Sequence, residues 1–168
     1  MRRSIFTDYY EHIIYELHPR PAVIENVDKM IHCGDPSYGG AMYGGENSII
    51  SLNENATLNI QNNKACSKQH NAYGGAISGG TINITGNTNV TISGNLAESV
   101  NGQSWGGAIH GKNVNISNNG SVLIENNAEI DANGTRMLAI QAEELLNLSA
   151  GANQTIRVHD AVKALGSV

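Results

Sequence analysis

Aliphatic residues recur along the chain with a period of 32 residues. Three series carry this period, and every member of each series is Ile, Leu or Val. The series are Ile50, Ile82, Val114 and Leu146; Leu52, Ile84, Ile116 and Leu148; and Ile60, Ile92, Ile124 and Ile156. Within each unit the apolar positions alternate with polar ones, which is typical of β-strands. The pattern predicts short strands whose equivalent positions stack from one unit to the next.

A second motif opens each unit. The copies are Gly39-Gly40-Ala41-Met42, Gly74-Gly75-Ala76-Ile77 and Gly106-Gly107-Ala108-Ile109, with a decayed copy in Arg136-Met137-Leu138-Ala139-Ile140. Its alanines predict a row in which only a thin side chain fits. Tyr38, Tyr73 and Trp105 precede the first three copies, and we expect them to stack with offset rings. The spacing between copies is looser before Gly-Gly-Ala than in the two strands that follow, which places the length variation in that loop.

Asparagine follows each alternating strand at a fixed offset. The first series is Asn55, Asn87 and Asn119, with Gly151 in the last unit; the second is Asn63, Asn95 and Asn127, with His159 last. Asn and Gly tolerate left-handed backbone conformations, so these positions predict corners between strands. Stacked asparagines can also hydrogen-bond along the row as amide ladders.

These motifs together predict an all-β chain, a parallel β-helix of the single-stranded, pectin-lyase-like type with about four coils. The units lie near residues 39–73, 74–105, 106–136 and 137–168, and each is expected to hold three strands: Gly-Gly-Ala-Ile and the two alternating ones. Apolar residues at helical spacing in residues 1–21 predict a helical cap that covers the first coil of residues 22–168.

The composition agrees with a thin core and narrows the function. The chain has 22 Asn and 19 Gly among 168 residues, and aromatic residues make up only 5%. The net charge is −5 without a basic stripe, which argues against nucleic-acid binding. Asp8 and Glu11 interrupt any apolar stretch after Met1-Arg2-Arg3, so we expect no signal peptide. The sequence contains no run of 18 apolar residues, so we expect no transmembrane helix.

The paired motifs resemble the repeats of the polymorphic outer-membrane protein family, which are autotransporter passenger domains with Gly-Gly-Ala-[Ile/Leu/Val] and Phe-x-x-Asn motifs. The matching residues are 39–42, 74–77 and 106–109, then 60–63, 92–95 and 124–127, and the resemblance covers roughly residues 36–160. Here Ile60, Ile92 and Ile124 replace the family's Phe. The family's export signal and C-terminal β-barrel are not recognisable in this chain, which therefore resembles a passenger fragment.

The resemblance implies a right-handed β-helix, exposure at the bacterial surface or outer membrane or secretion, and a role in adhesion or antigen display. We therefore predict a non-enzymatic scaffold without a cofactor. Its partner would be a host surface molecule or glycan. Edge-to-edge self-association through the last coil is a further expectation.

A carbohydrate-active enzyme, either a polysaccharide lyase or a hydrolase, is the alternative function, because such enzymes need clustered carboxylates. The candidate acids fall in different slots of the repeat: Glu54, Glu98, Glu125, Glu129, Asp131 and Asp160. Arg136 and Arg157 lie late in the chain, away from most of the acids. We therefore interpret the acids as solvated surface charge. His110, which follows Ile109 where Ser78 follows Ile77, is expected to be an outward polar residue.

Cys33 and Cys66 fall in equivalent loops of neighbouring units. A disulfide between them requires Cα atoms within about 7 Å; the alternative, which we favour, is two free thiols. His32, Cys33, Cys66 and His70 together are residues of the types that bind zinc. Their spacing matches no tight zinc motif, so we expect no metal.

Overall fold

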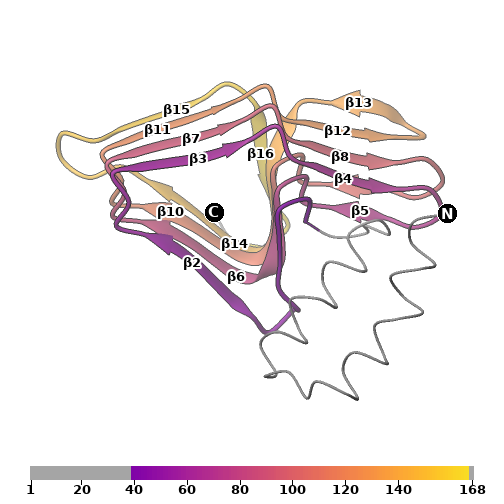
Figure 1. Cartoon of the computed structure of the whole chain (residues 1–168), viewed down its shortest axis with the longest axis horizontal. Coiled ribbons are helices and arrows are strands. Elements are labelled where there is room, and N and C mark those ends of the chain that lie inside the picture. Colours follow the sequence, from indigo (N-terminus) through magenta and orange to yellow (C-terminus); the bar gives the residue numbers. More distant parts are fainter. Residues whose placement is uncertain (1–38, 167–168) are drawn as a thin grey trace, which may run out of the picture. The chain divides into compact units, whose positions relative to one another are not determined.

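The computed structural model describes residues 39–166, and all regular structure in them is β-strand. The cap predicted over residues 1–21 lies outside the described residues. The strands form stacked, mainly parallel sheets in which successive coils lie side by side (Figure 1). The predicted all-β parallel β-helix of about four coils is therefore confirmed.

Three sheets make up the faces of the coil. The longest contains β1 (Met42–Tyr43), β2 (Ile49–Asn53), β6 (Ile77–Thr85), β10 (Ile109–Ser117), β14 (Leu138–Ser149) and β16 (Ala161–Ala164). The second contains β3 (Thr57–Gln61), β7 (Asn89–Ser93), β11 (Ser121–Glu125) and β15 (Thr155–Val158). The third contains β4 (Lys64–Ser67), β8 (Leu96–Ser99), β12 (Ala128–Asp131) and β13 (Gly134–Arg136), and a small fourth sheet pairs β5 (Ala72–Tyr73) with β9 (Ser104–Trp105).

The predicted division of the unit into strands is wrong in one respect. The Ile of Gly-Gly-Ala-Ile and the first alternating segment lie in one continuous strand of nine residues, as in β6 and β10, and Gly-Gly-Ala precedes this strand. The third face of the coil comes instead from the four residues that follow the second corner, as in β8. Small residues occupy the buried positions of that strand, so it lacks the aliphatic alternation that marks the other two.

The length variation also lies elsewhere than expected. In the first coil the long strand is split into β1 and β2, which both pair with β6 in register. The loop between them, residues 44–48, contains the extra residues of the first unit. The insertion therefore follows Gly-Gly-Ala and interrupts a strand, whereas the loop before Gly-Gly-Ala keeps its length from the second coil to the third.

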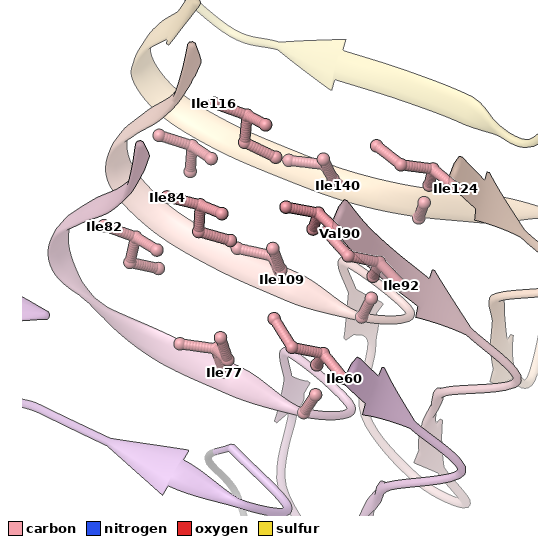
Figure 2. Close-up of a cluster of buried hydrophobic side chains, with 14 of the residues drawn as sticks. Ile60, Ile77, Ile82, Ile84, Val90, Ile92, Ile109, Ile116, Ile124 and Ile140 are labelled. Carbon is pink, nitrogen blue, oxygen red and sulfur yellow. The ribbon is translucent and has the colours of Figure 1, made fainter. Parts of the chain in front are cut away.

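The aliphatic rows fill the interior of the coil (Figure 2). The first two predicted series stack in register through Leu146 and Leu148. The third holds from Ile60 through Ile124, but its last member is wrong, because Ile124 pairs with Val158 and Ile156 pairs with Val122. The last coil is therefore displaced by two residues on this face.

Both asparagine rows form hydrogen-bonded ladders, as predicted. In the first, Asn55 Nδ2 donates to Asn87 Oδ1 at 2.8 Å, and Asn87 donates to Asn119 at 2.9 Å. In the second, Asn63 donates to Asn95 and Asn95 donates to Asn127, each at 2.9 Å. Every bond joins neighbouring coils, so the ladders tie the stack together where the chain turns.

The second ladder ends differently from the prediction. Asn127 Nδ2 donates to Asp160 Oδ2 at 2.8 Å, and the Asp160 carboxylate also accepts from the backbone N–H groups of Asn126 and Asn127. His159, the residue expected in this slot, is exposed. The displacement of β15 brings Asp160 into the row.

The left-handed residues at the corners are those directly before the ladder asparagines. They include Asn62, Gly94 and Asn126, with φ of 57°, 67° and 59°. The ladder asparagines themselves have ordinary φ. The predicted location of the corners is therefore correct. At each corner the left-handed residue permits the turn, and the asparagine that follows it forms the hydrogen bond to the next coil.

The ladder makes a specific prediction for Asn95→Ala. The change removes the acceptor for Asn63 N and Nδ2 and the donor to Ile60 O and Asn127 Oδ1. We expect a loss of about 2–3 kcal/mol in the free energy of unfolding, because buried polar groups lose their partners. Urea titration followed by circular dichroism measures it. Asn59→Ala, at an exposed position of β3, is the matched control, and an equal effect of both changes would contradict the ladder's role.

The two glycines of Gly-Gly-Ala are required for different structural reasons. Gly74 and Gly106 adopt φ of +57° and +67°, which a side chain rarely tolerates. At Gly75 a Cβ atom would lie 2.0 Å from the backbone oxygen of Gly107, so the second glycine is required by close approach between coils. Ala76 and Ala108 are fully buried in the thin row predicted from the sequence.

Candidate functional site

A groove of about 400 Å³ lies over the outer side of the longest sheet, near the Gly-Gly-Ala turns. Its floor comes from residues that follow the buried Ile77 and Ile109 along their strands. Since neighbouring residues of a strand point to opposite faces, Ser78 and His110 face away from the core. They pair in register with each other, and Ser78 also pairs with Tyr43.

Aromatic rings from the short strands β5 and β9 cover this row. The ring of Tyr73 packs on Trp105 edge to face, with centroids 4.7 Å apart and an interplanar angle of 61°. The predicted aromatic row therefore forms between these two, although not with offset rings; Tyr38 lies outside the described residues. His110 extends the cluster, at 5.0 Å from Tyr73 and 6.0 Å from Trp105.

His110 was expected to be an outward polar residue, and this expectation is wrong about its exposure to solvent. The residue is only 7% exposed, because the two aromatic rings cover it. Burial lowers the pKa of its imidazole to about 4, so the ring is neutral at neutral pH. Its Nε2 lies 3.5 Å from Glu143 Oε1 but makes no hydrogen bond. We regard the pair as a contact between a carboxylate and a neutral ring, because the desolvation that lowers the pKa outweighs attraction to a half-exposed Glu143.

The burial of His110 predicts a pH dependence of stability. Its folded pKa, about 4, lies below the unfolded value of 6.5, so its contribution is complete above pH 6.5 and is lost as the pH falls toward 4. The expected loss between these limits is about 3 kcal/mol. Urea titrations at pH 7 and pH 4.5 measure it.

His110→Phe keeps an aromatic ring in the cluster and should remove this contribution, whereas exposed His70→Gln should not. Glu129, whose pKa burial raises, titrates with the opposite sign, so the comparison with His110→Phe isolates the imidazole. An unchanged pH dependence in His110→Phe would contradict the assignment.

Charged side chains form the rim of the groove. Glu46, Glu143 and Glu144 bring three carboxylates to it, and Lys112 brings one ammonium group, which lies 3.2 Å from Glu144 Oε1. Glu143 and Glu144 are adjacent on β14, and their side chains are each about half exposed, at 51% and 56%. The rim is therefore net acidic.

A second charged cluster lies on the third face, beside a pocket of about 360 Å³. Arg136 Nε donates to Glu129 Oε2 at 3.0 Å, and its Nη2 donates to Asp131 Oδ2 at 2.7 Å. Arg136 was expected to lie away from most of the acids, but the antiparallel hairpin of β12 and β13 folds it back onto two of them. The interpretation of the acids as solvated surface charge is therefore wrong for this pair. Glu129 and Asp131 are also buried, not solvated.

The electrostatics of this cluster agree with a structural role. The hydrogen bond from Arg136 lowers the pKa of Asp131 to about 2, whereas burial raises the pKa of Glu129. Glu129 Oε1 accepts the backbone N–H of Gly106. In the earlier coils the equivalent N–H groups of Gly39 and Gly74 donate to a carbonyl of the next coil. The Glu129 side chain thus supplies the acceptor that the irregular last coil does not provide.

A signal in the sequence points to this cluster. Glu129 follows Ala65 and Ala97 at the 32-residue period, and Asp131 follows Ser67 and Ser99. These are the buried positions of β4, β8 and β12. The series is visible only once the third strand has been recognised, because its members are small or polar.

The remaining predicted site residues are separate from both clusters. Among the described residues Cys66 has no disulfide partner, and its Sγ donates a hydrogen bond to Glu98 Oε2 at 3.7 Å; Glu98 also pairs with Lys64. Cys33 and His32 lie outside the described residues, so the question of a disulfide stays a prediction. Within residues 39–166 no three His, Cys, Asp or Glu side chains are grouped as metal ligands.

The fold and its ladders place the chain in the class of parallel β-solenoid proteins. No family model, curated protein or solved structure matches the sequence. In the part of the chain that the structure describes, no helix has the length and apolar character needed to cross a bilayer.

Proposed function

We propose that this chain is a non-enzymatic scaffold of the bacterial cell surface, a passenger-domain fragment of an autotransporter-like adhesin or surface antigen. The main support is the way in which buried polar groups are used. The buried asparagines join coil to coil, and buried Glu129 and Asp131 are held by Arg136. These groups stiffen a stack whose outer surface is left to bind other molecules.

A carbohydrate-active enzyme is the second candidate, and the groove is the observation that favours it. Glu143 lies 3.5 Å from the neutral imidazole of His110, and Glu144 is its neighbour on β14. A carboxylate beside an imidazole can exchange protons with a substrate. Both glutamate side chains are about half exposed, at 51% and 56%, whereas the general acid of a glycosidase typically lies in an apolar setting, so the groove favours binding over acid catalysis.

Two measurements test the scaffold proposal. Antibodies against residues 39–166 should label intact cells of the source organism, and external protease should remove the epitope. Labelling that requires permeabilised cells would contradict surface display. The purified chain should also release no products from a panel of neutral and acidic polysaccharides, and turnover that is lost in Glu143→Gln would establish the enzyme instead.

A further inference from the structure

One buried side-chain nitrogen or oxygen atom in the described residues has no hydrogen-bond partner, and it is Nε2 of His110. Buried polar atoms are nearly always paired in folded proteins, so a lone one needs a physical reason. The atom belongs to a side chain that is only 9% exposed and that lines the groove over β6 and β10. The site is therefore built around a hydrogen-bonding group that the protein itself does not satisfy.

The position of Glu143 indicates what would satisfy it. Its Oε1 is 3.5 Å from His110 Nε2, too far and too poorly aligned for a hydrogen bond. A hydroxyl group can serve both atoms, because it accepts from an imidazole N–H while donating its own hydrogen to the carboxylate. The Glu143 side chain is about half exposed and can turn to admit such a group.

The aromatic rings supply the other half of the site. Trp105 and Tyr73 line the groove beside His110 and are each half-buried. An exposed aromatic face binds the apolar C–H face of a ring-shaped ligand, and the groove volume of about 400 Å³ lies within the range of small-molecule pockets, about 300–1,000 Å³. A ligand with an apolar face and a rim of hydroxyl groups fits both elements, and a pyranose ring has this form.

The charges of the rim restrict the saccharide. Three glutamates face one lysine, and Lys112 is already paired with Glu144. A uronate or sulfated sugar would bring a further negative charge to this rim, which the local carboxylates would repel. We propose that the groove formed by Trp105, Tyr73, His110 and Glu143 binds a neutral saccharide. This inference rests on the proposed scaffold function and specifies the chemical class of its partner.

The test uses the purified full chain and an array of neutral oligosaccharides that includes cello-, laminari-, manno- and chito-hexaose. Polygalacturonate oligomers and heparin hexasaccharide are the anionic comparisons, and oligolysine represents a cationic peptide. We expect at least one neutral oligosaccharide to bind in calorimetric titration, and the anionic ones not to bind. His110→Phe and Glu143→Ala should each weaken that binding at least about tenfold.

Two variants outside the groove are the controls. Glu125→Gln on β11 and Lys68→Gln, at an exposed loop position, should leave the affinity unchanged. Thermal melts establish that each variant is folded. Glu143→Ala alters a half-exposed side chain, so it keeps the test decisive even if His110→Phe does not fold.

The outcomes separate this inference from the scaffold proposal. No binding across the neutral array, or binding that survives both groove variants, overturns the saccharide site and leaves the scaffold unaffected. Binding of oligolysine alone overturns it in favour of a peptide partner. Chromatography of the same titration samples detects cleavage: a bound and cleaved oligosaccharide supports the site and refutes the non-enzymatic proposal.

Discussion

Ile92→Asp should abolish the cooperative folding of the solenoid. Ile92 is fully buried in the middle of its row, between Ile60 and Ile124 on the neighbouring coils. An aspartate there would be an unpaired charge in an apolar interior, and no described hydrogen-bond donor of the row could compensate it. The expected loss exceeds about 4 kcal/mol, a large part of the stability of an ordinary domain. Circular dichroism and amide dispersion in NMR spectra measure the outcome.

Thr91→Asp is the matched control. Thr91 precedes Ile92 on the same strand and points to the outer face, where it is only half-buried. We expect this variant to fold with a change in stability below about 1 kcal/mol. Native stability in Ile92→Asp would show that the row does not face inward and would refute the assigned register.

The second large effect is expected from Arg136→Met. Removing the guanidinium leaves Glu129, which is 1% exposed, with the backbone N–H of Gly106 as its remaining described partner. Breaking a buried ion pair by deleting one member typically costs about 3–5 kcal/mol, and the half-exposed position of Arg136 places the expected value near the lower limit, about 3 kcal/mol. Chemical denaturation at pH 7 measures it.

A second change separates the charge from the packing. Glu129→Gln in the Arg136→Met background removes the uncompensated charge and should restore most of the lost stability. Arg157→Met, at an exposed position of β15, should have little effect. If the double variant were as unstable as Arg136→Met alone, loss of packing and not the buried carboxylate would be the cause.

The parts of the fold that the sequence predicts are those with large, repeated side chains. Ile82 and Ile84 occupy slots that only a buried strand explains, and the asparagine rows mark the corners. The third face was missed because its buried positions are Ala97 and Ser99, which have no recognisable apolar pattern. Its small residues are nevertheless required, since this face packs closely against the Gly-Gly turns: a Cβ at Gly75 would lie 2.5 Å from the backbone of Leu96.

The candidate groove could be predicted only in part. The aromatic row was visible in the sequence, since Tyr73 and Trp105 occupy equivalent positions. The burial of His110 was not, because it depends on the rings of β5 and β9 and on the continuous strand β10 that carries the residue. Glu143 comes from a decayed unit whose register shifts by one residue against β10, so a fixed period does not align it with the groove.

The ladder that ends at Asp160 gives the stack a direction. In this row the Asn63 side-chain amide donates to Asn95, Asn95 donates to Asn127, and Asn127 donates to the carboxylate of Asp160. An ionised carboxylate has no hydrogen to pass on. The carboxylate oxygen that replaces the amide nitrogen at Asp160 therefore ends this row of side-chain hydrogen bonds, so the ladder has a donor end at Asn63 and an acceptor end at Asp160 in the described residues.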